Sequence, residues 1–218
     1  MKRSVWLAWA VLCLVCAAFT GAAAAPDATA FVRQVGNEMP GVLAGTHTIE
    51  ERRARLMPFI EHVVDVPAVA AYCLGHYWKL ATAAQQQQLQ SLFLSVVVNT
   101  IATWTDDHKG FGMKANVVMQ APIPRADGTY VPTLVQAGDA PVVNITWVVD
   151  MQDQPARILD VMADGISVRR MERSDFVGYL NHTGGDIDGL IGVLRKRALA
   201  MGGLTDSAAP ATLKNALP

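Results

Sequence analysis

The sequence predicts an α+β fold, in which a strongly twisted antiparallel sheet of four or five strands packs against a helical part. Before Gly110, apolar residues recur at spacings of three and four, the period of an amphipathic helix. After Gly110 the spacing changes to two, the period of a half-buried strand. Short links between the strands imply an antiparallel meander, and helical spacing returns near Ser174.

The N-terminus predicts a cleavable secretory signal peptide over residues 1–24. Lys2 and Arg3 form its positively charged start, Val5–Phe19 is its apolar stretch, and Ala22–Ala24 supply the small residues that a signal peptidase reads. A membrane anchor is the alternative interpretation. It is disfavoured because the apolar stretch is shorter than the roughly 20 residues that span a bilayer.

Removal of this signal leaves about 194 residues, enough for one domain with a sizeable core. We expect that domain at residues 25–201, followed by a disordered tail at 202–218 that is rich in Gly, Ala, Pro and Ser. Acidic residues then outnumber basic ones by three and no basic stripe occurs, so nucleic acid is not expected as a partner. Cys13 and Cys16 leave with the signal, so Cys73 has no disulfide partner within the chain and is interpreted as a core residue.

Capping residues predict three helices at the start of the domain. Asp27 can cap the first helix, which Pro40 disturbs or ends. Thr48 and Glu51 form a capping box for the second helix. Asp65 can cap a short third helix.

The clearest helix of the sequence begins at Thr82, which forms a second capping box with Gln85. Its apolar stripe is sustained over four turns at spacings of three and four. The stripe comprises Leu89, Leu92, Phe93, Val96, Val97, Thr100, Ile101 and Trp104.

Four strands follow, at Met113–Gln120, Tyr130–Gln136, Val142–Met151 and Ile158–Met162. Two helices then close the domain. Ser174 is expected to cap the first of them.

Sequence motifs typical of common catalytic or metal sites do not occur. Of the five histidines, only His76 lies within three to five residues of a cysteine, Cys73, and no second such pair occurs in the predicted mature chain, so the set of ligands for a zinc site is incomplete. No G-x-S-x-G or G-x-x-x-x-G-K-[ST] motif occurs, so the sequence implies no serine-hydrolase site and no nucleotide, metal or other cofactor. Asp160 and Asp164 flank the fourth strand and could serve as acid and base, although a turn at Asp164-Gly165 is the preferred interpretation.

Four segments resemble those of a known family in order and spacing. They are Val64–Val66 with Leu74–Trp78 ("D…LG..W"), Asp160–Ser167 ("D-V-x-x-x-G-[VI]-S"), Arg173–Phe176 ("R-S-x-F") and the closing helix at Gly189–Leu194. The family is that of MlaC-type proteins, the periplasmic auxiliary components of toluene-tolerance or lipid-asymmetry ABC transporters. Ala156 stands where that family usually has a tryptophan, and an aromatic residue common near Thr103 is displaced to Trp104. The sequence therefore resembles a divergent branch, such as the hopanoid-associated HpnM branch.

The resemblance implies a nuclear-transport-factor-like sheet, a helical part and a lipid cavity between them. It also implies a soluble periplasmic carrier of a phospholipid or hopanoid, without enzymatic activity. The implied partners are an inner-membrane ABC transporter with an MCE-domain subunit and an outer-membrane lipoprotein complex. Hiding about 30 methylenes from water is worth roughly 24 kcal/mol at about 0.8 kcal/mol each, so such a carrier must offer a comparable dry cavity.

We expect the cavity to have one helical wall and one sheet wall. The helical wall would comprise Phe93, Val97, Ile101 and Trp104. The sheet wall would comprise Val117, Val135, Ile145, Trp147 and Val161, with Phe176 and Leu180 closing the cavity. A shift of one residue in strand facing would replace the sheet set by its neighbours.

Apolar periodicity alone does not distinguish a hollow interior from a filled core. Two other functions therefore stay open. One is an envelope enzyme that uses Asp160 or Asp164, and the other is a non-catalytic binding or assembly module with a filled core. Lipid that co-purifies with the mature protein would favour the carrier.

Overall fold

The computed structural model describes residues 27–107, 115–137, 142–152 and 155–201, so the predicted signal peptide and tail lie outside the described residues. The α+β class is confirmed, with all described strand pairs between named strands antiparallel. The elements are α1 (Ala28–Leu43), α2 (Ile49–Val63), α3 (Val66–Leu74), the 3-10 helix η1 (Gly75–Lys79), α4 (Ala83–Asp107), β1 (Ala115–Met119), β2 (Ile123–Arg125), β3 (Gly128–Ala137), β4 (Val143–Asp150), β5 (Arg157–Ala163), β6 (Ile166–Ser167), α5 (Val168–His182) and α6 (Ile187–Ala200).

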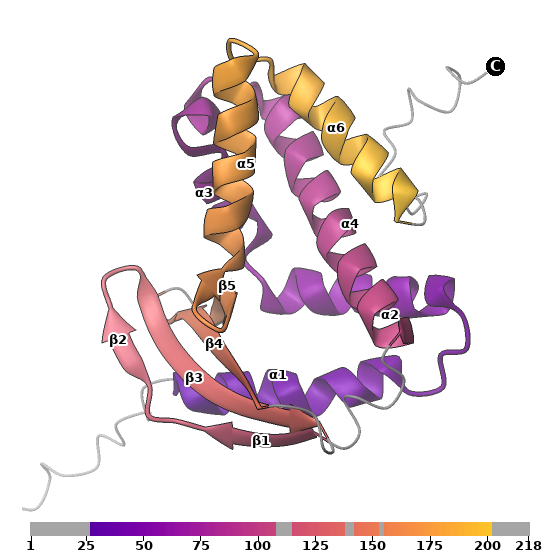
Figure 1. Cartoon of the computed structure of the whole chain (residues 1–218), viewed down its shortest axis with the longest axis vertical. Coiled ribbons are helices and arrows are strands. Elements are labelled where there is room, and N and C mark those ends of the chain that lie inside the picture. The colour runs from indigo at the N-terminus through magenta and orange to yellow at the C-terminus, as the bar shows by residue number, and fades with distance from the viewer. Residues whose placement is uncertain (1–26, 108–114, 138–141, 153–154, 202–218) are drawn as a thin grey trace, which may run out of the picture.

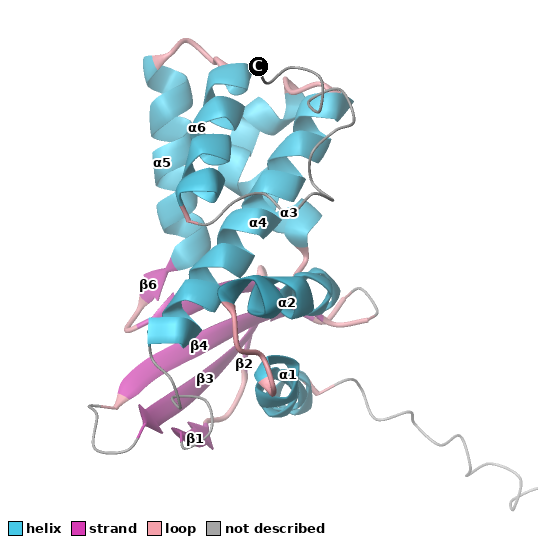
Figure 2. Cartoon of the chain, turned by 90° about the vertical axis from the view of Figure 1, so that its right-hand side faces the viewer, coloured by secondary structure: helices cyan, strands magenta, loops and turns pink. Residues whose placement is uncertain are grey.

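The sheet occupies one end of the molecule and most of the helices occupy the other (Figure 1). α1 runs across one face of the sheet, while α3, α4, α5 and α6 stand together at the far end (Figure 2). α2 lies between these parts and packs against both α1 and α4.

The strand order is β1-β3-β4-β5-β6, and β2 also pairs with β3. The four predicted strands are present, and the structure adds β2 and β6, which are too short to show a period in the sequence. β1 and β2 both lie along the same edge of β3, interrupted opposite Pro132. Gln120 donates its N–H to the carbonyl of Pro132 at 2.9 Å, but Pro132 has no N–H to return, so the ladder stops there.

Local capping chemistry places most helix starts as predicted. The N–H of Glu51 donates to Thr48 Oγ1 at 3.1 Å, and the Glu51 carboxylate accepts from the N–H of Thr48. Thr82 and Gln85 make the same reciprocal pair. Asp65 accepts the N–H of Ala68 at 2.9 Å and so caps α3.

α1 continues through Pro40 to Leu43, three residues beyond the position where the sequence allows an end. A proline inside a helix leaves the carbonyl four residues earlier without its donor. That carbonyl belongs to Gly36, which is exposed, so water can satisfy it.

The predicted cap at Ser174 is wrong, because α5 begins seven residues earlier and Ser174 lies inside it. Ser167 is the cap, and its Oγ accepts the N–H of Arg170 at 3.1 Å. The first turns of α5 bury two charged side chains, Arg169 and Glu172. A polar stretch of this kind carries little apolar periodicity, so the helix start is hidden in the sequence.

The apolar core is divided between the two ends of the molecule. The helical clusters centre on residues such as Leu92, Leu180 and Leu56. The sheet clusters centre on Val131, Val149 and Ile158, which pack against α1 and α2. Among the described residues, no apolar cluster contains side chains of both α4 and the sheet.

Candidate functional site

The sheet turns one face toward α1 and α2, and we call it the inner face. All five predicted sheet-wall residues lie on this face. They are Val117, Val135, Ile145, Trp147 and Val161. Residues directly opposite on antiparallel strands share a face, and Val117 pairs with Val135 while Trp147 pairs with Val161.

Helices cover only part of the inner face. Val131 and Val149 are fully buried beneath Val32 of α1. Ile158 is buried against Val63 of α2. This part of the interface is filled by side chains in the ordinary way.

The helices bury the inner face less at the end that is formed by β1 and the adjoining parts of β3 and β4. Val135 and Ile145 are half-buried there, and Val117 is 48% exposed. Trp147 is also half-buried, and its indole Nε1–H donates to Thr133 Oγ1 at 3.3 Å. Thr133 in turn donates to the carbonyl of Ile145 at 2.8 Å. Sequence reasoning missed Thr133, although its alternation with Val135 puts it on the same face.

On the helical side, α4 presents a half-buried apolar stripe that packs against the cluster around Leu56. Its described members are Leu94, Val97 and Ile101, at spacings of three and four. Leu94 was not predicted as a wall residue. Trp104 follows on α4, but its side chain lies outside the described ones.

Val64 connects the two sides. It forms a parallel bridge with Ile158, and the next residue, Asp65, donates its N–H to the Ile158 carbonyl at 3.0 Å. Its side chain packs against both helical clusters and one sheet cluster. We define the interlayer surface as these half-buried residues of both layers: Val64, Leu94, Val97, Ile101, Trp147 and Val161.

The remaining predicted wall residues lie elsewhere. Phe93, Phe176 and Leu180 are buried in the core between α3, α4, α5 and α6. The structure thus places Val97 and Ile101 against the cluster around Leu56, and Trp147 and Val161 against the cluster around Ile158, and Val64 packs against both clusters. It holds the other three in a packed helical core, where their lining role stays a prediction.

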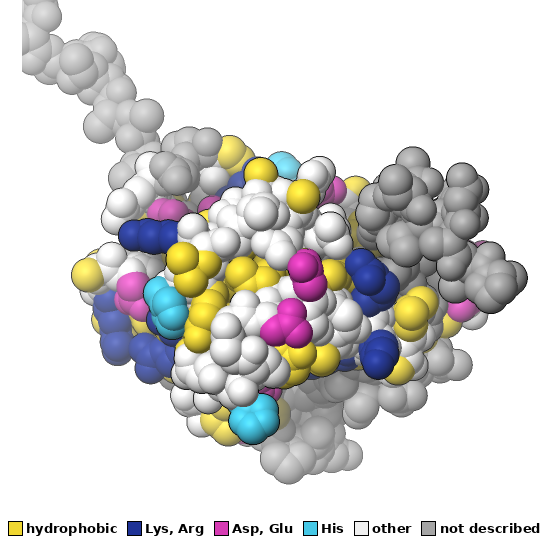
Figure 3. All heavy atoms as spheres, turned by 90° about the horizontal axis from the view of Figure 1, so that it is seen from above, with side chains coloured by type: hydrophobic (Ala, Val, Ile, Leu, Met, Phe, Trp, Pro, Cys, Tyr) yellow, Lys and Arg dark blue, Asp and Glu magenta, His cyan; other side chains and the backbone are white. Residues whose placement is uncertain are grey.

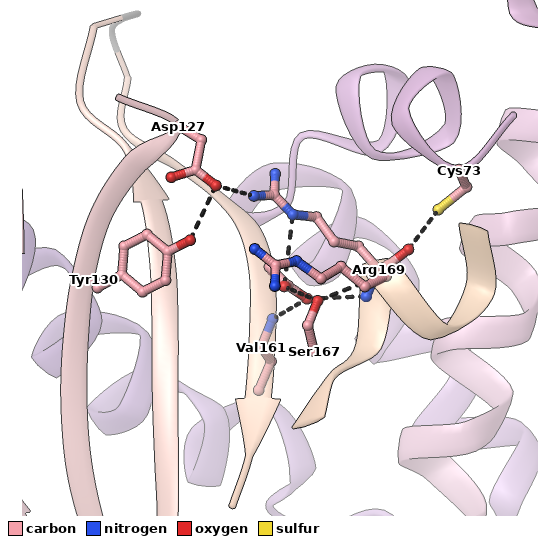
Figure 4. Close-up of polar contacts among 8 residues, drawn as sticks. Cys73, Asp127, Tyr130, Val161, Ser167 and Arg169 are labelled. Carbon is pink, nitrogen blue, oxygen red and sulfur yellow. Dashed lines mark hydrogen bonds and ion pairs between the residues drawn. The ribbon is translucent and has the colours of Figure 1, made fainter. Parts of the chain in front are cut away.

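A buried polar network, the polar joint, fastens α5 to the sheet (Figure 4). The Asp160 carboxylate accepts from the Ser167 hydroxyl at 2.5 Å and from the N–H of Arg169 at 3.0 Å. The Arg169 side chain lies between two carboxylates: its Nη2 is 2.8 Å from Asp127, and its Nε is 3.5 Å from Asp160. The Tyr130 hydroxyl donates to the same Asp127 at 3.0 Å, and burial with this bond raises the pKa of Tyr130.

The two aspartates considered as an acid–base pair have separate structural roles. Asp160 belongs to the polar joint, while Asp164 is a turn residue with a φ of 46°. One Asp164 oxygen accepts the N–H of Asn144 at 3.1 Å. The preferred interpretation of Asp164 as a turn residue is therefore confirmed.

Two other surfaces of the described residues are polar or mixed. A hollow of about 240 Å³ at the β2–β3 turn has Arg125, Asp127 and Asp150 in its lining, which suits acyl chains poorly. The helical end mixes hydrophobic, acidic, basic and histidine side chains (Figure 3). Within the described ranges, no three metal-ligating side chains gather, and none of the helices combines the length and apolarity needed to cross a bilayer.

Comparison with known proteins agrees with this arrangement. The model of one family, the MlaC protein, matches residues 36–196. The chain belongs to the MlaC family. A solved structure of the phospholipid-binding protein from Ralstonia solanacearum, in complex with a phospholipid, is similar to it with a TM-score of 0.69 and 20% identity, over 81% of this chain and 99% of that one. At this identity the likeness shows a shared fold. No curated protein matches the chain.

The segments that resemble other MlaC proteins hold this one together at the polar joint and beside it. Gly75 has a φ of +59°, and a Cβ placed on it would lie 2.8–3.0 Å from the guanidinium of Arg173. Arg173 donates to the carbonyl of Tyr72, whose ring also lies 4.6 Å from the Arg169 guanidinium carbon. The "LG" and "R-S-x-F" segments therefore meet in space, and only glycine fits at their contact.

Cys73 is a core residue in this MlaC-family chain, as its apolar surroundings predict. It is fully buried, and its Sγ lies 3.6 Å from the carbonyl of Arg169. Burial, reinforced by the negative charge of Glu172, raises the pKa of the thiol to about 12. The thiol therefore stays protonated and unreactive at neutral pH.

Proposed function

We propose that this MlaC-family chain is a periplasmic lipid carrier whose interlayer surface contacts the acyl chains of its cargo. The single observation that carries the proposal is the divided core. Half-buried apolar residues of α4 pack against the cluster around Leu56, half-buried residues of the sheet's inner face pack against the cluster around Ile158, and Val64 is common to both clusters. Apolar side chains left partly uncovered inside a domain mark a place for an apolar ligand.

Phospholipid is the cargo that the comparisons favour, since the similar protein from Ralstonia solanacearum is described as phospholipid-binding and holds a phospholipid. Acyl chains need apolar contact and exclusion of water, and both walls of the interlayer surface are aliphatic or aromatic. A hopanoid, the cargo implied by resemblance to the HpnM branch, meets the same requirement. Lipid identification distinguishes the two.

Transfer of such a cargo requires no group that makes or breaks covalent bonds. About 0.8 kcal/mol per buried methylene holds a lipid in a carrier, so release must be coupled to an acceptor or to an energy source. An inner-membrane ABC transporter with an MCE-domain subunit would supply that energy, and an outer-membrane lipoprotein complex would exchange the lipid with the carrier at the other membrane. Both partners, and the shuttling between them, are part of the proposal.

The test is to purify the mature protein from the periplasm of cells that produce it, and to measure the mass of the protein with any bound lipid by native mass spectrometry. Its lipid is then extracted and identified. Wild-type protein should carry about one phospholipid per chain. Val97→Trp should fold but lose most of that lipid, because the larger ring occupies the interlayer surface between α4 and the sheet.

Val193→Trp is the matched control, since Val193 is a 46% exposed valine on α6, outside the interlayer surface. It should retain lipid at the wild-type level. Full occupancy in a folded Val97→Trp protein would contradict the proposed wall. Wild-type protein free of lipid would favour the non-catalytic binding or assembly module instead.

A further inference from the structure

Within the part of the chain that the structure describes, β1 is an edge strand without the usual protection against pairing. It pairs with β3 on one side, and no described element lies beyond its other side in either view (Figures 1 and 2). Val117 and Val118, which point to opposite faces, are 48% and 50% exposed. Open edges in natural proteins are commonly blocked by charged residues, proline, bulges or short strand length.

The other edge segments have such protection. β2 continues the same edge of β3 and carries Pro124 and Arg125. β6, at the opposite edge, has two residues and leads directly into α5. The five residues of β1, Ala-Asn-Val-Val-Met, contain no charge, proline or glycine.

The hydrogen-bond pattern shows which backbone groups face outward. Gln120 donates to Pro132 of β3, and the register is continuous from there back to Ala115. Backbone groups alternate in direction along a strand. The odd-numbered residues Ala115, Val117 and Met119 therefore turn their N–H and C=O groups to the open edge.

We infer that this edge pairs with the same edge of a second copy of the chain. An antiparallel, two-fold arrangement centred on Val117 sets the N–H and C=O of Val117 against those of its copy. It also sets Ala115 against Met119 in both directions, so every outward group of β1 has a partner. The strand is uncharged, so self-pairing brings no like charges together, and Val117 meets its copy on the inner face.

The resulting dimer is weak. A five-residue edge buries less surface than the roughly 1,200 Å² at which stable interfaces begin. Dimers therefore form at high concentration, and the association continues the sheet across the two-fold axis. This inference does not depend on the proposed lipid cargo, because it uses only the edge of the sheet.

Sedimentation velocity tests it, with protein from about 10 μM to about 1 mM to cover the weak range. Wild-type mass should rise toward that of a dimer. Val117→Pro removes an outward N–H and none that faces β3, so the β1–β3 ladder is kept while association falls at least tenfold. Val117→Thr, which keeps the N–H and the β-branched shape, should associate as the wild type does.

If Val117→Pro fails to fold, Val117→Lys serves instead, since it puts two like charges opposite each other at the two-fold centre. Wild-type protein that stays monomeric at 1 mM would overturn the inference and leave the edge to a strand from another protein. Undiminished association of folded Val117→Pro or Val117→Lys would overturn it too, because the dimer would then use another surface.

Discussion

Asp160→Asn should destabilise the protein more than any other single change at the polar joint. The carboxylate is almost fully buried, accepts three hydrogen bonds and forms an ion pair with Arg169. The amide that replaces it carries no charge and has one acceptor instead of two. Arg169 then keeps only Asp127 as its charged partner.

The magnitude follows from that loss. Breaking a buried ion pair by removal of one partner costs about 3–5 kcal/mol. The lower end applies, about 3 kcal/mol, because Asp127 still compensates part of the charge. Ser167→Ala removes a helix cap together with one hydrogen bond to Asp160, and should cost about 1–2 kcal/mol. Asp175→Asn, an exposed change on the same helix, should stay within about 0.5 kcal/mol.

Urea unfolding at pH 7, followed by circular dichroism, measures all three variants. With a slope of about 2 kcal/mol per molar urea, the midpoint of Asp160→Asn should fall by roughly 1.5 M. A loss below about 1 kcal/mol for Asp160→Asn would refute the reasoning, since a buried charge pair cannot be lost so cheaply. A loss as large for Asp175→Asn would show that the effect does not come from the joint.

Two further changes test features beside the joint. Cys73 should resist thiol reagents at pH 8 until urea unfolds the chain. The pKa of Cys73 rises from 9.0 to about 12 on folding. The contribution of the protonated thiol to the free energy of unfolding is therefore fully present below pH 9 and is lost as the pH rises toward 12. Urea midpoints of the wild type and of Cys73→Ala at pH 8, 10 and 11 measure this loss. Gly75→Ala should lower stability by about 1–3 kcal/mol, since φ is +59° and Arg173 fills the space of a Cβ. Gly178→Ala, in open space on α5, should raise stability by about 0.5–1 kcal/mol, and equal effects at both glycines would contradict this account.

Features that depend on neighbours in sequence could be predicted from it. Capping boxes are complete within four residues, so Thr48 and Thr82 marked their helix starts correctly. Alternation with a period of two placed Val117 and Trp147 on one face, because a strand allows only two directions. The fold class and the family followed from the same local patterns, combined with four recognisable segments in order.

Features that depend on distant partners could not be predicted. Ser95 and Asn99 are polar residues of α4, yet both are only 2% exposed, and Asn99 donates to the carbonyl of Ala198 in α6. Phe176 and Leu180 were recognisable as apolar, but the sequence does not say which of two cores each one enters. The start of α5 was missed because the sequence does not show that Arg169 is buried there. Its burial depends on the charge of Asp127, which lies 42 residues away in the sequence.

The polar joint has a further consequence for a protein whose two ends share little apolar packing. Interlocked side chains normally fix how the parts of a domain sit on each other, and in the described residues no apolar cluster joins α4 to the sheet. Hydrogen bonds and ion pairs are directional, so the arrangement of Asp160, Ser167 and Arg169 permits one seating of α5 on the sheet where methyl groups would tolerate several. The orientation of α5 on the sheet is thus fixed by the hydrogen bonds and the ion pair of the polar joint, and apolar packing does not have to fix it.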